Sequence, residues 1–324
     1  MSKRSIGLVF LLVCFCALLS GAPSVWAEEW PTKHITMIVP FNAGGGADVS
    51  ARLLAKHWEK ELGVKVVVEN RPGAQGQVGA THFLSLPDDG EYVLAGAQIY
   101  YSTNIILQDA PYAIDDIAAL NFTEIDPCCL VVTPESPYRT FAELHAAIQA
   151  NPGKLRLGVD RGSPVTIMAH ALKEHFNWDI KIINYEGGPQ MQTALLGKHI
   201  DMGVGVFMSC LGKERFLALW SNERHPAIPD VPTLNEVMGK ELPLVGMSRF
   251  IAVRSSVKEK YPERYRVLLE TLEKTHRNPD YLQELEKSGR IKVTRWLGPD
   301  KSGELNRRLH EMTVQYKELL SGSK

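Results

Sequence analysis

The sequence lacks a membrane-spanning segment and has few cysteines. No segment after the N-terminus stays free of charged residues for the roughly 20 positions that a membrane-spanning helix needs, and the first apolar stretch, from Ile6 to Leu19, is shorter too. That stretch follows Lys3 and Arg4 and precedes Ala27, which is the pattern of a secretory signal peptide. We therefore expect cleavage of residues 1–27 and export to the periplasm, with an uncleaved N-terminal anchor as the alternative.

Charge of one sign is not in excess. The chain carries 36 basic and 37 acidic residues, and removing residues 1–27, which hold two basic residues and no acidic one, leaves a net charge of −3. This balance argues against nucleic-acid binding, and any affinity for an anion must then come from local geometry. The 297 residues that remain of 324 are more than one hydrophobic core usually holds and suit two lobes.

Common catalytic and metal-binding motifs are also missing. There is no Gly-Lys-Ser/Thr, Gly-x-Gly-x-x-Gly, Gly-x-Ser-x-Gly or Cys-x-x-Cys, and the five-residue spacing of His170 and His175 does not place both on one helical face. We expect no enzyme, no cofactor and no metal, with a hydrolase on a two-lobed scaffold as the alternative. Cys128, Cys129 and Cys210 remain after export, so either Cys210 pairs with a neighbour or all three are buried thiols.

The exported part alternates short apolar runs with amphipathic segments, which is typical of βα units around mostly parallel sheets. The stiff stretch Pro134–Pro137 suits a crossover between lobes. We expect 28–132 plus 251–324 to form lobe 1 and 133–250 to form lobe 2, with a cleft at the carboxyl ends of the strands. Strands are predicted at 35–39, 64–68, 92–96, 129–133, 155–159, 180–184, 200–206 and 250–253, and helices at 140–150, 166–176, 262–277, 279–287 and 300–320.

Two small-residue turns join strands to helices in the predicted lobe 1. The first, Pro40 to Asp48, contains three consecutive glycines, which let the main chain approach a ligand while the first turn of the helix offers N–H groups to an anion such as a carboxylate. A structural turn capped by Asp48 is the alternative. The second turn, Glu69 to Ala80, contains Arg71, which either pairs with the ligand or pairs with an acid on the surface.

The motifs of the chain resemble, in order, the extracytoplasmic solute receptors of the tripartite tricarboxylate transporter family, also called Bug receptors. The likeness spans nearly the whole exported chain. It is carried by Trp30-Pro31, Ile35–Phe41, Ala43–Asp48, Ala51-Arg52, Val68–Ala74, Gly162-Ser163, His170–Leu172, Asn184–Gly188, Leu195–Gly197 and Pro229–Leu234.

The resemblance implies a two-lobed α/β periplasmic-binding-protein fold of type II, the Venus-flytrap arrangement, with a central cleft. It implies a periplasmic receptor, expected to be monomeric, that binds a carboxylated solute and delivers it to the membrane permease. In the family the two lobe 1 loops hold a carboxylate largely through main-chain groups and water. The residues expected to bind ligand are Phe41, Asn42, Ala43, Gly44, Gly45, Asp48, Ala74, Gln75, Gly76, Gln98, Ser163, Thr166, His170 and Tyr185, with a packing role as the alternative for His170.

Two segments depart from the family pattern. Ala97–Tyr101 is bulkier than the small residues that are usual there, and Gly205–Cys210 is more apolar. These departures favour a ligand with one carboxylate and a hydrophobic body, a hypothesis that equally tight binding of a citrate-like trianion would contradict. A sensor whose closed form signals to a membrane receptor is an alternative function, because both functions use ligand-driven closure.

Overall fold

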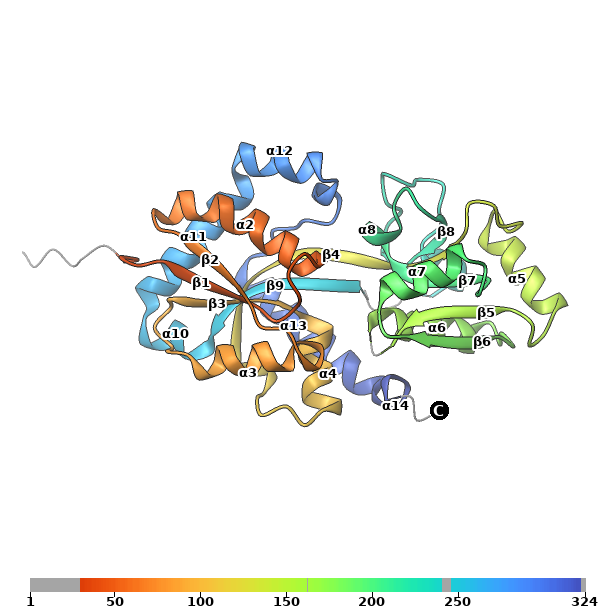
Figure 1. The fold of residues 1–324 in the computed structure, drawn as a ribbon, viewed down its shortest axis with the longest axis horizontal. Helices are drawn as coiled ribbons and strands as arrows, with labels where there is room; N and C mark the ends of the chain where they lie inside the picture. Colours follow the sequence, from red (N-terminus) through yellow and green to blue (C-terminus); the bar gives the residue numbers. More distant parts are fainter. Residues whose placement is uncertain (1–29, 162, 241–245, 322–324) are drawn as a thin grey trace, which may run out of the picture.

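The computed structural model describes residues 30–161, 163–240 and 246–321, so the expected signal peptide lies outside the described residues. The strands hydrogen-bond in the order β2-β1-β3-β9-β4-β7-β5-β6, and β8 also pairs with β4. Two bodies, each a sheet covered by helices, lie on either side of the middle of this order (Figure 1). The fold is therefore a mixed α/β fold of two lobes, as expected.

Lobe 1 is built on a mostly parallel sheet. Strands β1 (Ile35–Val39), β2 (Val66–Asn70) and β3 (Tyr92–Ala97) are parallel, and β9 (Gly246–Arg254) runs antiparallel to β3. All five residues of β1 are buried, as expected for a strand with helices on both faces. Met37 packs in the cluster that contains Trp58, whereas its neighbour Ile38 packs with Phe83 on the opposite face.

The helices of lobe 1 cover both faces of this sheet. On the first face α2 (Gly46–Leu62) packs against α11 (Pro262–Arg277) and α12 (Pro279–Lys287), at the bounds predicted for the last two. On the second face lie α3 (Gln77–Ser85), α4 (Gln98–Leu107) and α13 (Gly298–Gln315). The shorter elements are η1 (Ala74–Gly76), η2 (Ile114–Asp116), α10 (Ser255–Lys260) and η3 (Arg290–Lys292).

Strand β4 (Ile117–Val132) is shared by the two lobes. Its residues up to Pro127 pair with β9, and from Cys128 onward it pairs with β7 (Met202–Val206) and β8 (Arg215–Leu219). The chain thus passes between the lobes inside one strand, before the proline-rich stretch that the sequence suggested. The first half of β4 was missed because buried polar residues, including Asn121 and Glu124, interrupt its apolar pattern.

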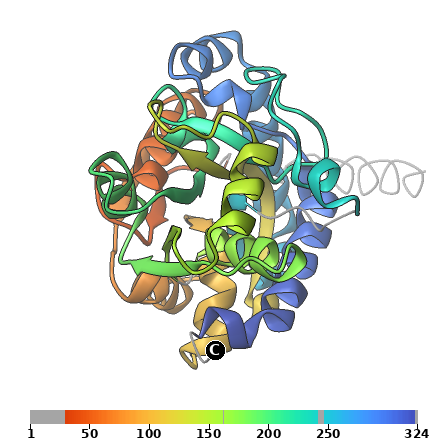
Figure 2. The same cartoon turned by 90° about the vertical axis from the view of Figure 1, so that its right-hand side faces the viewer.

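Lobe 2 repeats the βα pattern on a smaller scale. Strand β5 (Arg156–Asp160) runs parallel to β6 (Lys181–Tyr185) and β7. Its helices are α5 (Phe141–Ala150), α6 (Pro164–His175), α7 (Gly188–Leu196), α8 (Phe207–Cys210) and α9 (Leu234–Met238). The C-terminal helix α14 (Lys317–Leu320) packs against α6, so the tail of the chain reaches lobe 2; Figure 2 shows it beside that lobe.

The cysteines of the described residues, Cys128, Cys129 and Cys210, are free and buried. Burial raises the pKa of the Cys128 and Cys129 thiols. Of the two possibilities left open by the sequence, the structure therefore has the buried thiols, and the side chains contribute to packing around β4.

Candidate functional site

A cleft of about 540 Å³ opens at the carboxyl ends of the lobe 1 strands. Most of its lining residues are glycine, proline or apolar residues, and Arg249 is the charged one among them. The first loop and the start of α2 contribute Pro40, Phe41, Asn42, Gly45, Gly46 and Ala47, and the second loop contributes Pro72, Gly73, Gln75 and Gly76. The remaining lining residues are Ala97, Tyr100, Met247, Arg249 and, from α7 of lobe 2, Pro189.

The first loop is shaped by the buried carboxylate of Asp48. The main-chain N–H of Gly44 donates to Asp48 Oδ2 (2.8 Å), and Arg52 Nε and Asn70 Nδ2 donate to the same carboxylate (3.0 and 2.9 Å). Burial alone would raise the pKa of Asp48, but these hydrogen bonds outweigh it and hold the pKa below its ordinary value. Asp48 therefore supports the loop rather than lining the cleft, and α2 begins at Gly46 with its first N–H groups free of intrahelical acceptors.

The second loop has an uncommon backbone. Four consecutive residues have positive φ: Gly73 (137°), Ala74 (44°), Gln75 (51°) and Gly76 (94°). Two of them are not glycine, and such conformations persist only where the surroundings hold them, often at binding sites. The main-chain oxygen of Gln75 accepts a hydrogen bond from Asn104 Nδ2 (3.4 Å), which is one contact that fixes the loop on α4.

Asn70 joins the two loops. Its Nδ2 donates to the main-chain oxygen of Phe41 (3.0 Å) as well as to Asp48, and its Oδ1 accepts from Arg52 (2.9 Å). Arg71, in contrast, pairs with Glu69 on the surface, which confirms the surface interpretation of Arg71. Asn70 thus stabilises the first loop, and neither Asn70 nor Arg71 lines the cleft.

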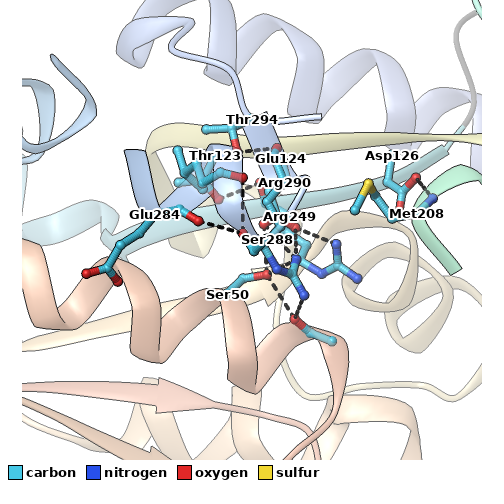
Figure 3. A network of polar contacts seen from close by, with 12 residues as sticks. Ser50, Thr123, Glu124, Asp126, Met208, Arg249, Glu284, Ser288, Arg290 and Thr294 are labelled. Atoms are coloured by element: carbon cyan, nitrogen blue, oxygen red, sulfur yellow. Dashed lines mark hydrogen bonds and ion pairs between the residues drawn. The ribbon is translucent and has the colours of Figure 1, made fainter. Parts of the chain in front are cut away.

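Arg249 brings a positive charge to the cleft from the middle of β9. Its Nη1 donates to Glu124 Oε2 (2.6 Å), and the two side chains are 15% and 4% exposed. Glu124 Oε1 also accepts from Arg290 Nη1 (2.9 Å) and Ser50 Oγ (2.8 Å), as Figure 3 shows. The Nη2 of Arg249 lies 3.2 Å from the position that a Cβ on Gly46 would occupy, so the guanidinium group lies beside the start of α2.

A second carboxyl group, that of Asp126, lies near this network (Figure 3). Its Oδ1 accepts a hydrogen bond from the main-chain N–H of Met208 in lobe 2 (3.0 Å). Burial raises the pKa of Asp126 to about 6, although the charge of Arg249 acts in the opposite direction. Two guanidinium groups therefore face two carboxyl groups, and only Arg249 of these four side chains lines the cleft.

One carboxyl group of lobe 2 lies near the cleft without lining it. Asp160, at the end of β5, interacts with the hydroxyl of Tyr100, which does line the cleft. Burial and the neighbouring charge of Glu186 raise the pKa of Asp160 to about 6, against the opposite effect of the Tyr100 hydroxyl. Ser163 Oγ and Thr166 Oγ1 both donate to the main-chain oxygen of Asp160 (2.8 and 2.9 Å), so neither hydroxyl points into the cleft.

Five of the fourteen residues expected to bind ligand line the cleft: Phe41, Asn42, Gly45, Gln75 and Gly76. The side chain of Gln98 is buried and donates to Ser102 Oγ (2.8 Å), on the side of α13. The half-buried His170 lies on α6, where burial lowers its pKa, and Tyr185 pairs with Asp160 at the end of β6. The other expected residues, Ala43, Gly44 and Ala74, lie in the two loops without lining the cleft.

Sequence reasoning missed Arg249, Met247 and Pro189. Arg249 stands between Ser248 and Phe250 in a mostly apolar, buried strand, and a charged residue in such a strand was the signal that could have identified it.

Across the described ranges 30–161, 163–240 and 246–321, no group of three or more His, Cys, Asp or Glu side chains is placed to hold a metal ion. No helix within those ranges is long and apolar enough to span a membrane.

The cleft and the two lobes define a solute-binding protein, and comparisons with known proteins give its family. The model of the tripartite tricarboxylate transporter family receptor matches residues 50–299, so the chain belongs to this family. A UPF0065 protein from Cupriavidus necator, from the gbd 5′ region, is 34% identical over 227 residues, which are 65% of this chain and 66% of that protein. The chain therefore spans just under two thirds of the length of this relative.

Solved structures agree with this fold. A TctC solute-binding protein from Polaromonas, without ligand, is 25% identical and superposes with a TM-score of 0.73 over 90% of this chain and 99% of that chain. MatC from Rhodopseudomonas palustris with bound malate is 18% identical, with a TM-score of 0.68 over 90% of this chain and 100% of that chain. The resemblance noted from the sequence motifs is thereby confirmed.

Proposed function

We propose that this chain is an exported receptor that binds a small carboxylated solute in the cleft and delivers it to the membrane permease of a tripartite tricarboxylate transporter. The observation that supports this most directly is the position of Arg249 beside the start of α2, where main-chain N–H groups without intrahelical acceptors meet a guanidinium group. Such groups together suit a carboxylate, because the charge-assisted hydrogen bonds they form are strong.

The loops provide the geometry that this function needs. Asp48 and Asn70 fix the first loop, and Asn104 fixes the second, so that their main-chain groups are oriented before a ligand arrives. A site that is already ordered loses less conformational entropy on binding. The expected binding residues Ala43, Gly44 and Ala74 remain part of this proposal as loop residues, and Arg249 and Tyr100 are added to them.

Closure of two lobes on the solute is the proposed mechanism of capture. The sequence suggested 28–132 plus 251–324 for lobe 1 and 133–250 for lobe 2. The strand pairing moves both crossings by about five residues, so we assign 30–127 plus 246–321 to lobe 1 and 128–240 to lobe 2, with β4 and β9 as the strands nearest the crossing. Export through cleavage after Ala27 and a monomeric state complete the proposal. Mass spectrometry of the protein from the periplasmic fraction should give a chain that begins at Glu28, and light scattering should give the mass of one chain.

A thermal-shift screen of the purified protein tests the binding function. Malate, adipate, citrate and aromatic acids are compared with their neutral amides, because a ligand that binds only the folded state raises the melting temperature with its concentration. We expect at least one acid to raise the melting temperature and its amide to leave it unchanged. Equal shifts with acids and amides, or no shift with any acid, would contradict a carboxylate receptor.

A deletion strain distinguishes transport from sensing. If the protein delivers the solute to a permease, loss of the gene abolishes uptake of the labelled solute while transcription of the transporter genes continues. If the protein is a sensor, transcription falls and expression of the transporter from another promoter restores uptake.

A further inference from the structure

A second pocket, of about 330 Å³, lies where β4 passes between the lobes and shares no lining residue with the cleft. Ile125 and Pro127 of β4 line it. The side chains that alternate with them, Glu124 and Asp126, are those drawn in Figure 3, so this pocket lies on the opposite face of the strand. The other lining residues are Ser221, Asn222, Glu223, Arg224, His225 and Pro226 of lobe 2 and Lys292 and Arg295 of lobe 1.

Positive charge is in excess around this second pocket. Among the described residues, no acidic side chain lies within ion-pair distance of Lys292 or Arg295. Arg224 is paired with Glu236 (3.0 Å), and Glu223 is the acidic residue among those that line the pocket. The chain as a whole carries a slight excess of negative charge, so this local excess of positive charge comes from the arrangement of the fold and attracts an anion.

His225 joins the two lobes at this second pocket. Its Nε2 donates to the main-chain oxygen of Lys292 (3.3 Å), and its Nδ1 accepts from the main-chain N–H of Ala227 (3.1 Å), so the neutral ring has a partner at each nitrogen. Burial lowers the pKa of His225, and the positive charges of Arg295 and Lys292 also lower it. His225 therefore holds the cations of the two lobes near each other without adding a charge at neutral pH.

We propose that this second pocket is a binding site for a phosphate-type oxyanion, held by Lys292 and Arg295 of lobe 1 and by Arg224 and Asn222 of lobe 2. A tetrahedral dianion suits the pocket because it neutralises both unpaired cations and offers oxygens in several directions, whereas a carboxylate offers two oxygens in one plane. An anion bound by both lobes favours this arrangement of the lobes over others. A soluble phosphate and the headgroup of an anionic phospholipid share this chemistry.

Calorimetric titration of the purified protein with sodium phosphate at low salt tests the site. We expect binding that weakens as sodium chloride is added. Lys292→Gln and Arg295→Gln should each weaken phosphate binding about fivefold, the effect of one exposed ion pair at the upper end of its range. Unchanged phosphate affinity in both variants overturns the proposal.

Lys301→Gln and Arg308→Gln are the matched controls for loss of positive charge. Both residues are exposed on α13, have no ion pair and do not line the second pocket. Phosphate affinity should be unchanged in both control variants. Equal losses in the controls and in Lys292→Gln and Arg295→Gln would trace the effect to overall charge and would overturn the site.

Arg249→Met separates this second pocket from the cleft. It removes the charged group that lines the cleft and should leave phosphate binding unchanged. Loss of phosphate binding in Arg249→Met, with none in Lys292→Gln, places the anion in the cleft and overturns the inference. That failure leaves the carboxylate receptor function standing, because the thermal-shift screen tests the cleft with other ligands.

Sedimentation with vesicles of phosphatidylglycerol, against vesicles of phosphatidylcholine, identifies the source of the oxyanion. Binding of sodium phosphate without sedimentation assigns a soluble oxyanion to the pocket. Sedimentation with phosphatidylglycerol alone, weakened in Lys292→Gln and Arg295→Gln, assigns a lipid headgroup. Binding of neither probe, or sedimentation that persists in both variants, overturns the proposal.

Discussion

Replacing Arg249 with methionine should weaken solute binding much more than the loss of a distant positive charge would. Methionine keeps much of the apolar length of the side chain and removes only the guanidinium group. If that group makes one charge-assisted hydrogen bond to the solute carboxylate, its loss costs about 1.5–3 kcal/mol, or about 10-fold to 150-fold in affinity. Glu124 keeps Arg290 Nη1 (2.9 Å) and Ser50 Oγ (2.8 Å), so stability should fall by no more than a similar amount.

Arg290→Met is the matched control for this prediction. Arg290 donates to the same carboxylate and is 14% exposed, close to the 15% of Arg249, but it does not line the cleft. Both variants should therefore lose similar stability in denaturant titration, and only Arg249→Met should lose affinity in calorimetry with the tightest acid of the screen. Equal losses of affinity in both variants would refute the reasoning, because they would trace the effect to Glu124 rather than to the cleft.

Three further predictions concern a glycine, a helix cap and a carboxyl group. Gly46→Ala should weaken binding, because its Cβ would lie 3.2 Å from Arg249 Nη2 and displace the guanidinium group. Gly303→Ala, in the interior of α13, should stabilise the protein by about 1 kcal/mol without affecting affinity; calorimetry and melting curves measure the two variants. Thr140→Ala removes a side-chain acceptor for the Glu143 N–H (3.2 Å) and should cost about 1 kcal/mol in denaturant titration with unchanged binding. The pKa of Asp160 is raised from 3.8 to about 6, so its carboxyl group binds a proton more tightly in the folded state, and the free energy of unfolding should fall as pH rises from about 4 to about 6. Asp160→Asn should remove this part of the pH dependence, as denaturant titrations at several pH values would show. Identical pH profiles of the two proteins would contradict the prediction.

The sequence predicted those parts of the fold that depend on local pattern. Strand β1 was predicted at its bounds because all five of its residues are apolar or half-apolar and buried, and Pro262 and Pro279 mark the starts of α11 and α12. The start of α5, predicted at 140, likewise depends on local spacing, because Thr140 and Glu143 lie three residues apart and form a capping box.

The missing parts of the site depend on contacts between distant residues. Arg249 and Glu124 are 125 residues apart in sequence and meet only because β9 lies between β3 and β4. Ser163 and Thr166 were expected to reach the ligand. Their hydroxyls instead donate hydrogen bonds to the main-chain oxygen of Asp160 at the end of β5, within the turn that joins this strand to α6. A sequence motif shows where small or polar residues stand, but it does not show which way their side chains point.

A crystal structure of the protein with its tightest-binding acid tests the central claim most directly. The claim predicts the carboxylate within hydrogen-bond distance of main-chain N–H groups of the two lobe 1 loops and of the Arg249 guanidinium group. Density for the acid away from these loops, with Arg249 still bound only to Glu124, would contradict it.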